Sequence, residues 1–355
     1  MRESSFSFLK EYVDAISPSG FEEKAARIWR DRAEEFADEV RGDLHGNSFA
    51  VVNPGGSPRI MFAGHTDEIG LMVSNINDKG FLFFNTIGGW DPQILVGQRV
   101  RLLGKEGVVK GVIGRRPVHL LEEEDKKKVV KPEQLWIDIG AEDKDQASER
   151  VGIGTPAVLD YGFSKVNDGL VAARGFDDKG GGFVVLEALR LLAGSDDLDA
   201  EVHAVATVQE EVGLRGAQTS AFGIDPDIGV AVDVGFATDT PMNEVDKRKV
   251  GDTEIGKGPI LTKGANVNPR VFEAFKSTAE ELDIPHQITG TPGGTGTDAN
   301  AIQLTRSGVA TGLLSLPVRY MHNPCELLDL ADLERTTQLL AEGVKGLRRD
   351  DLLPF

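Results

Sequence analysis

The stretch Val208-Gln209-Glu210-Glu211-Val212-Gly213 ends an apolar run that begins at Val202 and has the pattern of a buried parallel strand. Neighbouring side chains of a strand point to opposite faces, so two adjacent glutamates serve one site only where the strand ends and the backbone turns. Gly213 and Gly216 predict such a turn. We therefore expect one carboxylate to bind a metal ion while its neighbour transfers a proton.

Composition and charge restrict the class of protein. The chain has 355 residues, of which 40% are hydrophobic and 27% charged, as in soluble globular proteins with a large core. The formal net charge of −18 disfavours nonspecific nucleic-acid binding, because phosphate contacts need clustered lysine and arginine. No apolar run approaches the roughly 20 residues that a membrane-spanning helix needs. We therefore expect neither nucleic acid nor membrane as a partner.

Cysteine usage and the first residues predict the compartment. The single cysteine, Cys325, excludes an internal disulfide framework and any zinc site built from cysteines. Residues 1–10 are polar and lack the apolar core of a signal peptide. These features are typical of a cytoplasmic protein, which is what we expect here.

Local patterns on both sides of a central segment predict an α/β fold. Helical periodicity covers 6–16 and 21–36, with Ser19 predicted to cap the second helix and Glu22 at its third position. Strand patterns are found at 43–52, 59–64, 201–208, 228–234 and 309–316. Further helical patterns are found at 179–192, 269–282, 298–307 and 330–347. Strands that alternate with helices predict a mostly parallel central sheet flanked by helices on both faces.

The segment 69–166 has a different pattern. Short β-like runs at 69–76, 81–86, 99–103, 107–113 and 135–139 are separated by glycines, and helical periodicity is confined to 143–150. We interpret this segment as a small β-rich insertion, either a barrel or an open sandwich. The predicted division is therefore a catalytic domain formed by 1–68 plus 167–355, with 69–166 inserted into it.

Histidines and acidic residues follow five of the predicted strands or strand-like segments. They are His65 with Asp67, Asp177 with Asp178, Glu210 with Glu211, Asp233, and His322. A single acid at a strand exit is usually a solvated loop residue or a helix cap. Five such positions are expected to share one edge of the sheet, where the carboxyl ends of parallel strands meet. Imidazole and carboxylate ligands without thiolate suit zinc, cobalt or manganese in a hydrolytic site.

This set is large enough for two metal ions. Two histidines and three carboxylates can bind a pair of ions if one carboxylate bridges them, and such a pair activates water and polarises a carbonyl. Asp67 is placed to fix the tautomer of His65. One of the two adjacent glutamates is the natural general base.

The motifs resemble those of the M42 family of metallopeptidases, the glutamyl-aminopeptidase or tetrahedral-aminopeptidase type. They are Gly64-His65-Thr66-Asp67-Glu68-Ile69-Gly70, Phe176-Asp177-Asp178-Lys179, Gln209-Glu210-Glu211-Val212-Gly213, Val232-Asp233 and Arg319-Tyr320-Met321-His322. Gly88-Gly89-Trp90-Asp91-Pro92 and Trp136-Ile137-Asp138-Ile139-Gly140 are similar to that family's inserted domain. The resemblance implies a dinuclear aminopeptidase with a PDZ-like inserted dimerisation domain, often assembled as a tetrahedral dodecamer.

The resemblance also implies a role for each site residue. The metal ligands would be His65, Asp177, Glu211, Asp233 and His322. Asp177 would bridge both ions, while His65 and Asp233 would bind different ions. Glu210 would be the general base and Asp67 would orient His65. We also expect a strained, cis peptide bond after Asp177.

The favoured function is therefore a metal-dependent aminopeptidase that removes N-terminal residues from short peptides. In this hypothesis two divalent ions, zinc or cobalt in the first place, bind the attacking water or hydroxide. The loop 289–297 is expected to line the substrate, but no substrate-binding residue is assigned, and acidic, basic and apolar N-terminal residues all stay open as substrates.

Three other functions stay as alternatives. A related metal-dependent deacylase or carboxypeptidase would use similar ligands. An endoglucanase-type glycosidase needs two carboxyl groups flanking a sugar cleft, and aromatic residues, which such a cleft uses as platforms, are only 6% of the chain. A non-enzymatic, self-assembling binding protein is disfavoured by the complete ligand set.

Overall fold

The computed structural model describes residues 1–195, 197–241 and 244–353. Within these residues the main sheet has eight strands in the order β1-β2-β12-β3-β13-β16-β14-β15. The strands are β1 (Glu39–Gly42), β2 (Ser48–Val52), β3 (Arg59–His65), β12 (Glu201–Thr207), β13 (Ile228–Phe236), β14 (Ile260–Gly264), β15 (Gln287–Thr291) and β16 (Ala310–Val318). The central pairs β12–β3, β3–β13 and β13–β16 are parallel, which confirms the prediction of a mostly parallel sheet.

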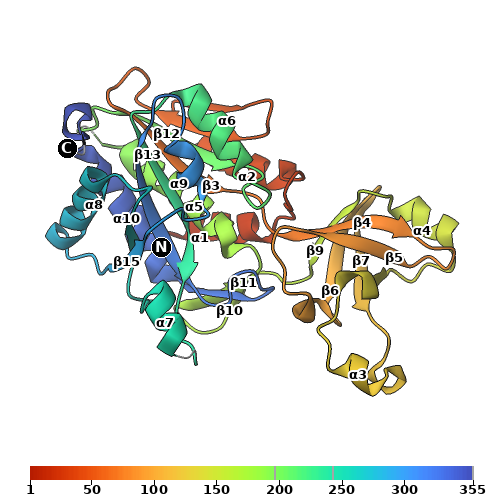
Figure 1. The fold of residues 1–355 in the computed structure, drawn as a ribbon. Helices are drawn as coiled ribbons and strands as arrows, with labels where there is room; N and C mark the ends of the chain where they lie inside the picture. Colours follow the sequence, from red (N-terminus) through yellow and green to blue (C-terminus); the bar gives the residue numbers. More distant parts are fainter. Residues whose placement is uncertain (196, 242–243, 354–355) are drawn as a thin grey trace.

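Helices cover both faces of this sheet (Figure 1). Alternate residues of the strands pack against each layer: Phe62 and Val202 belong to the core on one face, and Met61 and Val205 to the core on the other. The first layer contains α1 (Glu3–Asp14), α2 (Glu23–Ala33), α5 (Phe176–Leu192), α8 (Pro269–Glu281) and α10 (Leu330–Lys345). The second layer contains α6 (Arg215–Ile224) and α9 (Asp298–Ile302). The predicted flanking helices are therefore present on both faces.

Smaller elements complete this part of the chain. A short antiparallel sheet is formed by β10 (Ser164–Lys165), β11 (Leu170–Ala173) and β17 (Glu326–Asp329). Helix α7 spans Glu244–Val250. Among the described residues, no helix has both the length and the apolar character that a membrane crossing requires.

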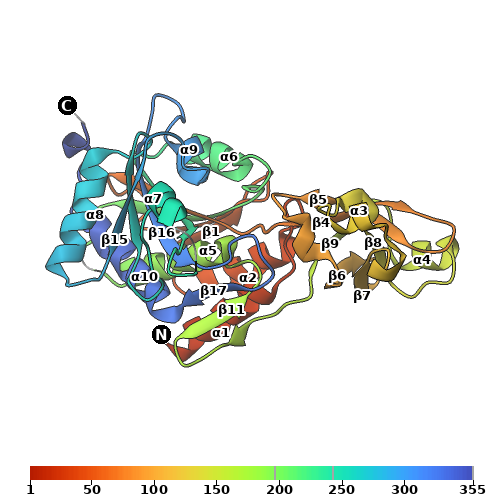
Figure 2. The same cartoon turned by 60° about the horizontal axis from the view of Figure 1, so that its bottom comes forward.

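The inserted segment forms a closed barrel that lies to one side of the main sheet (Figures 1 and 2). Its strands are β4 (Gly70–Ile76), β5 (Leu82–Ile87), β6 (Arg99–Gly104), β7 (Gly107–Gly114), β8 (Trp136–Asp138) and β9 (Pro156–Leu159). Two helices, α3 (Glu123–Lys126) and α4 (Lys144–Arg150), accompany them. The barrel has its own core, which includes Leu71, Val100 and Ile137. Of the two predicted forms, barrel and open sandwich, the barrel is present, while the PDZ-like description stays a prediction.

Two local predictions are wrong. The strand predicted over 43–52 begins only at Ser48, because the Asp43 carboxylate accepts the amides of residues 45, 46 and 47 and makes a turn between β1 and β2. Ser19 does not cap the second helix, since its hydroxyl donates to Asp67 Oδ2 at 2.7 Å, and Glu22 stands at the N-cap of α2. A long-range partner thus replaces the local capping interaction.

Several other elements differ from the sequence patterns. The helix predicted over 298–307 ends at Ile302. Helix α6 begins where only a turn is predicted, and its small residues Gly216, Ala217 and Ala221 carry little hydrophobic periodicity. Strands β9, β14 and β15 are not predicted, because they are short and their alternating pattern is weak.

A buried ion cluster joins the end of α1 to the end of β3. Lys179 Nζ donates to Glu68 Oε1 and to the Ala15 carbonyl, both at 2.8 Å. Arg174 pairs with the other oxygen of Glu68 at 3.2 Å and donates to the carbonyls that end α1. Lys179 is fully buried and Glu68 is 2% exposed, so each charge depends on its partners.

We expect Lys179→Met to lower the free energy of unfolding by about 3–5 kcal/mol, because Glu68 would keep only one cationic partner in the interior. Urea unfolding followed by circular dichroism measures this change. Lys276→Met, which removes an exposed pair with Glu280, is the control and is expected to change stability little. A Lys179→Met protein as stable as wild type would show that the cluster does not hold α1 in place.

Candidate metal centre

The segments that follow four parallel strands meet at one edge of the main sheet. β3 ends in His65 and is followed by Asp67, and β12 leads to Glu210 and Glu211. The remaining predicted residues arrive from α5, β13 and the segment after β16, and they are Asp177, Asp233 and His322. Because the carboxyl ends of parallel strands share one edge, residues distant in sequence become neighbours there.

Asp177 lies between the two histidines. Its Oδ1 is 3.2 Å from His65 Nε2, and its Oδ2 is 3.3 Å from His322 Nε2. The carboxylate is 7% exposed, and the Asp177–Asp178 peptide bond is cis, as expected. One carboxylate therefore presents one oxygen to each imidazole, which is the arrangement that a bridging ligand requires.

The two adjacent glutamates reach the same site because β12 ends before them. The strand stops at Thr207, and Gln209 has a φ of 55°, so the backbone turns at this point. Glu210 Oε2 then lies 3.9 Å from His65 Nε2, and Glu211 Oε1 lies 3.5 Å from His322 Nε2. The turn that the glutamate pair requires is therefore present.

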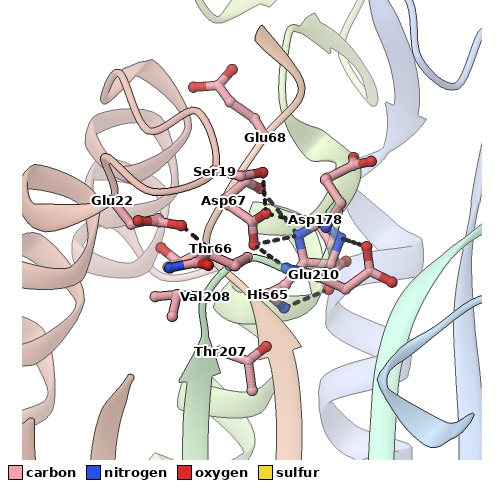
Figure 3. Close-up of polar contacts among 12 residues, drawn as sticks. Ser19, Glu22, His65, Thr66, Asp67, Glu68, Asp178, Thr207, Val208 and Glu210 are labelled. Atoms are coloured by element: carbon pink, nitrogen blue, oxygen red, sulfur yellow. Dashed lines mark hydrogen bonds and ion pairs between the residues drawn. The ribbon is translucent and has the colours of Figure 1, made fainter. Parts of the chain in front are cut away.

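Asp67 contacts both His65 and the turn that carries the glutamates (Figure 3). Its carboxylate accepts the amides of Glu210 at 3.0 Å and Glu211 at 3.2 Å, and the Ser19 hydroxyl. His65 Nδ1 lies 3.1 Å from the Asp67 carbonyl oxygen and 3.4 Å from its Oδ1. Asp67 thus connects the imidazole to the backbone of the neighbouring strand end.

Both imidazoles direct Nε2 toward Asp177. His322 Nδ1 is 2.7 Å from the carbonyl oxygen of Gly89, which belongs to the inserted segment, and His65 Nδ1 faces the Asp67 carbonyl. A carbonyl oxygen accepts a hydrogen bond, so each Nδ1 donates and each Nε2 keeps a lone pair for a metal ion. The contribution of Gly89 has no signal in the sequence beyond its position beside Trp90.

Two further buried acids support the predicted set. Asp178 is fully buried and accepts the amides of His65 and Gly181. The approach is close, since a Cβ on Gly181 would lie 2.4 Å from the Asp178 carboxylate. Glu326 is 2% exposed and accepts the amides of Asp177 and His322. The sequence points to Asp178 through the adjacent pair Asp177-Asp178, but nothing in the sequence indicates Glu326.

The electrostatics of the site favour a bound cation. Desolvation, together with Asp233 and Asp298, raises the pKa of Glu210 to about 10 against the opposing effect of His65. Burial likewise raises the pKa of Asp233 well above its usual range, and burial raises that of Glu211. Burial and mutual repulsion favour the neutral form of carboxyl groups whose pKa is raised. A divalent cation bound among them favours the ionised form instead. The donor set therefore fits a divalent metal ion.

Two groups of potential ligands come close enough to share an ion. They are His65, Asp178 and Asp233, and His65, Asp177 and Glu211, with ligand atoms within 4.8 Å of one another in each group. Asp178 already accepts two backbone amides, so Asp177 is the freer carboxylate. His65 belongs to both groups, whereas Asp233 belongs to one and Glu211 to the other, so the division of the ligands between two ions stays a prediction.

A cavity of about 460 Å³ opens over these ligands. His65, Asp177, Glu210, Glu211, Asp233 and His322 line its floor. Its wall includes Phe236, Met321 and residues 295–297 of the glycine-rich loop. The loop that the sequence analysis expects to line the substrate is therefore part of the wall.

The family model of the M42 glutamyl aminopeptidases matches residues 46–339. The chain belongs to the M42 glutamyl aminopeptidase family. A lysyl aminopeptidase of Pyrococcus furiosus is 36% identical over 352 residues, which cover 98% of this chain and 99% of that protein. This M42 protein is therefore a metal-dependent aminopeptidase, as the sequence predicts.

Two solved structures of TET peptidases have the same fold. The TET aminopeptidase of the marine sediment archaeon Thaumarchaeota archaeon SCGC AB-539-E09 superposes with a TM-score of 0.93 at 37% identity, with 99% of each chain covered. The Pyrococcus horikoshii TET1 peptidase superposes with a TM-score of 0.84 at 35% identity, covering 95% of this chain and 98% of that one. That peptidase can assemble into a tetrahedron or a large octahedral shell.

Proposed function

We propose that this aminopeptidase cleaves the N-terminal residue of short peptides at a pair of divalent ions, zinc or cobalt, with Asp177 as the shared ligand. The observation that supports a pair is the contact of the two Asp177 oxygens with different histidines, at 3.2 and 3.3 Å. Bound there, the ions would supply Lewis-acid polarisation of the scissile carbonyl and acidify the attacking water.

The ligand groups suggest how the five predicted residues are shared. His65 and Asp233 would hold one ion together with Asp177, because His65 is close to Asp233 in one group of potential ligands and contacts Asp177 Oδ1 at 3.2 Å. Glu211 and His322 would hold the other ion, since their nearest atoms are 3.5 Å apart and His322 also contacts Asp177. Asp67 would keep His65 in the tautomer that leaves Nε2 free.

Glu210 is the proposed general base. Its carboxylate lines the cavity, with Oε2 3.9 Å from His65 Nε2, and from there it would take a proton from the attacking water. The same oxygen would pass that proton to the departing amine nitrogen. Glu211, its neighbour, contacts His322 and is better placed as a ligand.

We further propose that the chain forms a homo-oligomer through its inserted barrel, which would act as the PDZ-like dimerisation domain that the resemblance implies. Several large apolar side chains of this segment are exposed in the single chain, namely Val108, Val112, Val118, Leu120 and Val129. Where such side chains adjoin one another, they form the apolar surface that contacts between protein chains use. A dimer, or a tetrahedral assembly like that of the TET1 peptidase, would cover them.

The function is tested with peptide p-nitroanilides that carry either a free or an acetylated N-terminus. We expect hydrolysis of the free-amine substrates only, loss of activity in EDTA, and recovery on addition of cobalt or zinc. Cleavage of the acetylated p-nitroanilides as well would contradict an exopeptidase that needs a free amine, whereas hydrolysis of N-acyl amino acids would support the deacylase or carboxypeptidase alternative. Hydrolysis of cellulose that persists in EDTA would support the glycosidase.

A further inference from the structure

We propose that Glu22 and Asn47 are positioning residues, which hold the turn that carries both Glu210 and Glu211 at the distance that catalysis needs. This turn, residues 208–211, is called the glutamate turn below. The inference rests on the proposed role of Glu210 as the general base. Neither residue touches the cavity over the metal ligands, so both would act through the backbone of the turn.

Four consecutive backbone amides of the glutamate turn donate to side-chain oxygens from the first 67 residues. Val208 N donates to Asn47 Oδ1 at 3.1 Å, and Gln209 N donates to Glu22 Oε1 at 3.2 Å. The next two amides, those of Glu210 and Glu211, donate to Asp67. Figure 3 shows Glu22 and Asp67 on the same side of the strand end at Val208. The whole turn is therefore fixed by three acceptors that are distant from it in sequence.

The acceptors Asn47, Glu22 and Asp67 matter because residues of the glutamate turn line two cavities. Glu210 and Glu211 line the cavity of about 460 Å³ over the ligands. Gln209 lines a second cavity of about 1,080 Å³ on the other side, together with Glu22 and Asn47. Val208 is buried, and the four amides of the turn donate to Asn47, Glu22 and Asp67.

Both proposed positioning residues are themselves held in place. Glu22 is 7% exposed, and its Oε1 also accepts the Gly20 amide at 2.7 Å. Asn47 is fully buried and donates to Asp43 Oδ2 at 2.8 Å and to Thr219 Oγ1 at 3.0 Å. Because these contacts already hold both side chains in place, their hydrogen bonds to the glutamate turn cost little further conformational entropy.

The position of the glutamate turn sets two distances at once. Glu210 must reach the attacking water and Glu211 must reach the same ion as His322, so a small shift of the backbone moves both carboxylates. A displacement of about 1 Å in an active site can lower the rate about a hundredfold. Loss of one acceptor is therefore expected to act mainly on kcat and little on KM, since neither residue contacts the substrate cavity.

The test compares Glu22→Ala, Glu22→Gln and the control Glu23→Ala in the full-length, metal-loaded protein. Glu23 is the next residue of the same helix and lines the same cavity, but its carboxylate pairs with Arg27. We expect Glu22→Ala to lower kcat about tenfold to a hundredfold with KM within about twofold of wild type. Glu22→Gln keeps an acceptor oxygen and should retain kcat within about threefold of wild type. Glu23→Ala should match wild type.

Amide hydrogen exchange gives a readout that does not depend on activity. In metal-free and metal-loaded Glu22→Ala, the peptide that covers residues 208–211 should exchange at least about tenfold faster, while peptides from β3 and β13 should exchange at the wild-type rate. Equal kcat for Glu22→Ala and Glu23→Ala would overturn the proposal. Faster exchange throughout the protein, or unchanged exchange in the turn, would overturn it as well, because the effect would then be general destabilisation or act elsewhere.

Asn47→Ala provides a second variant with the same readouts, and it decides the question if Glu22→Ala does not fold. It should speed exchange at Val208 and lower kcat in the same way. If the wild-type protein cleaves no free-amine peptide with any metal, the proposed function fails. The exchange rates would still show whether Glu22 and Asn47 hold the turn.

Discussion

Replacing Glu210 with glutamine is expected to lower kcat by about two to four orders of magnitude, which is the usual contribution of general acid–base catalysis. Glutamine keeps the size and the hydrogen-bonding shape of the side chain but cannot take a proton. The measurement is steady-state kinetics on a free-amine p-nitroanilide. Metal content by mass spectrometry should stay at the wild-type value, because Glu210 is not among the proposed ligands.

The neighbouring residue provides the matched control. Glu211→Gln removes a proposed ligand from the same turn, so it should lower the metal content as well as kcat. The pair of variants therefore separates the base from the ligand at adjacent positions. The proposed roles are contradicted if Glu210→Gln loses metal, or if it keeps a kcat close to wild type.

Asp177→Asn should have an effect of similar size for a different reason. The amide has one oxygen in place of two and no negative charge, whereas the carboxylate now faces His65 and His322 at once. We expect the variant to bind at most one ion per chain and to lose about three orders of magnitude in kcat/KM, because metal ions contribute several kcal/mol to the stabilisation of the transition state. Metal titration and kinetics on the same samples measure both effects.

Asp227→Asn is the control for Asp177→Asn. Asp227 immediately precedes β13, at the opposite end of the strand that carries Asp233, and it accepts the Arg59 amide. Its replacement should leave metal content and kcat/KM unchanged. If Asp177→Asn binds two ions like wild type, then Asp177 is not the shared ligand.

The sequence predicts those site residues that lie at the ends of buried strands. Buried parallel strands have a clear apolar pattern, and their carboxyl ends meet at one edge, so the sequence alone predicts that His65, Glu210 and Asp233 lie together. The parallel sheet, its flanking helices and the β-rich insertion follow from the same patterns. The resemblance to a known family added the ligand roles, which patterns alone leave open.

Interactions between distant residues could not be read from the sequence. Ser19 has the spacing of a helix cap but donates to Asp67, and Asp43 replaces the start of a predicted strand with a turn by accepting three amides. The contacts of Glu326 with Asp177 and His322 depend on how β17 packs under the site. Local sequence patterns carry no information on such tertiary partners.

The family resemblance also did not determine how ligands divide between the ions. His65 and Asp233 were expected on different ions, and the ligand atoms of His65 lie within 4.8 Å of those of both Asp233 and Glu211. Strand order explains this proximity, since β3 and β13 are hydrogen-bonded neighbours in the sheet. The pairing of strands therefore brings His65 and Asp233 close together, and pairing is a property of the whole fold.

The central claim is that two ions bind on either side of Asp177. Crystals loaded with cobalt or zinc and measured at the absorption edge of the metal test it most directly. The account predicts two anomalous peaks per chain, about 3.5–4 Å apart, with one Asp177 oxygen next to each. A single peak, or two peaks that Asp177 does not bridge, would contradict it.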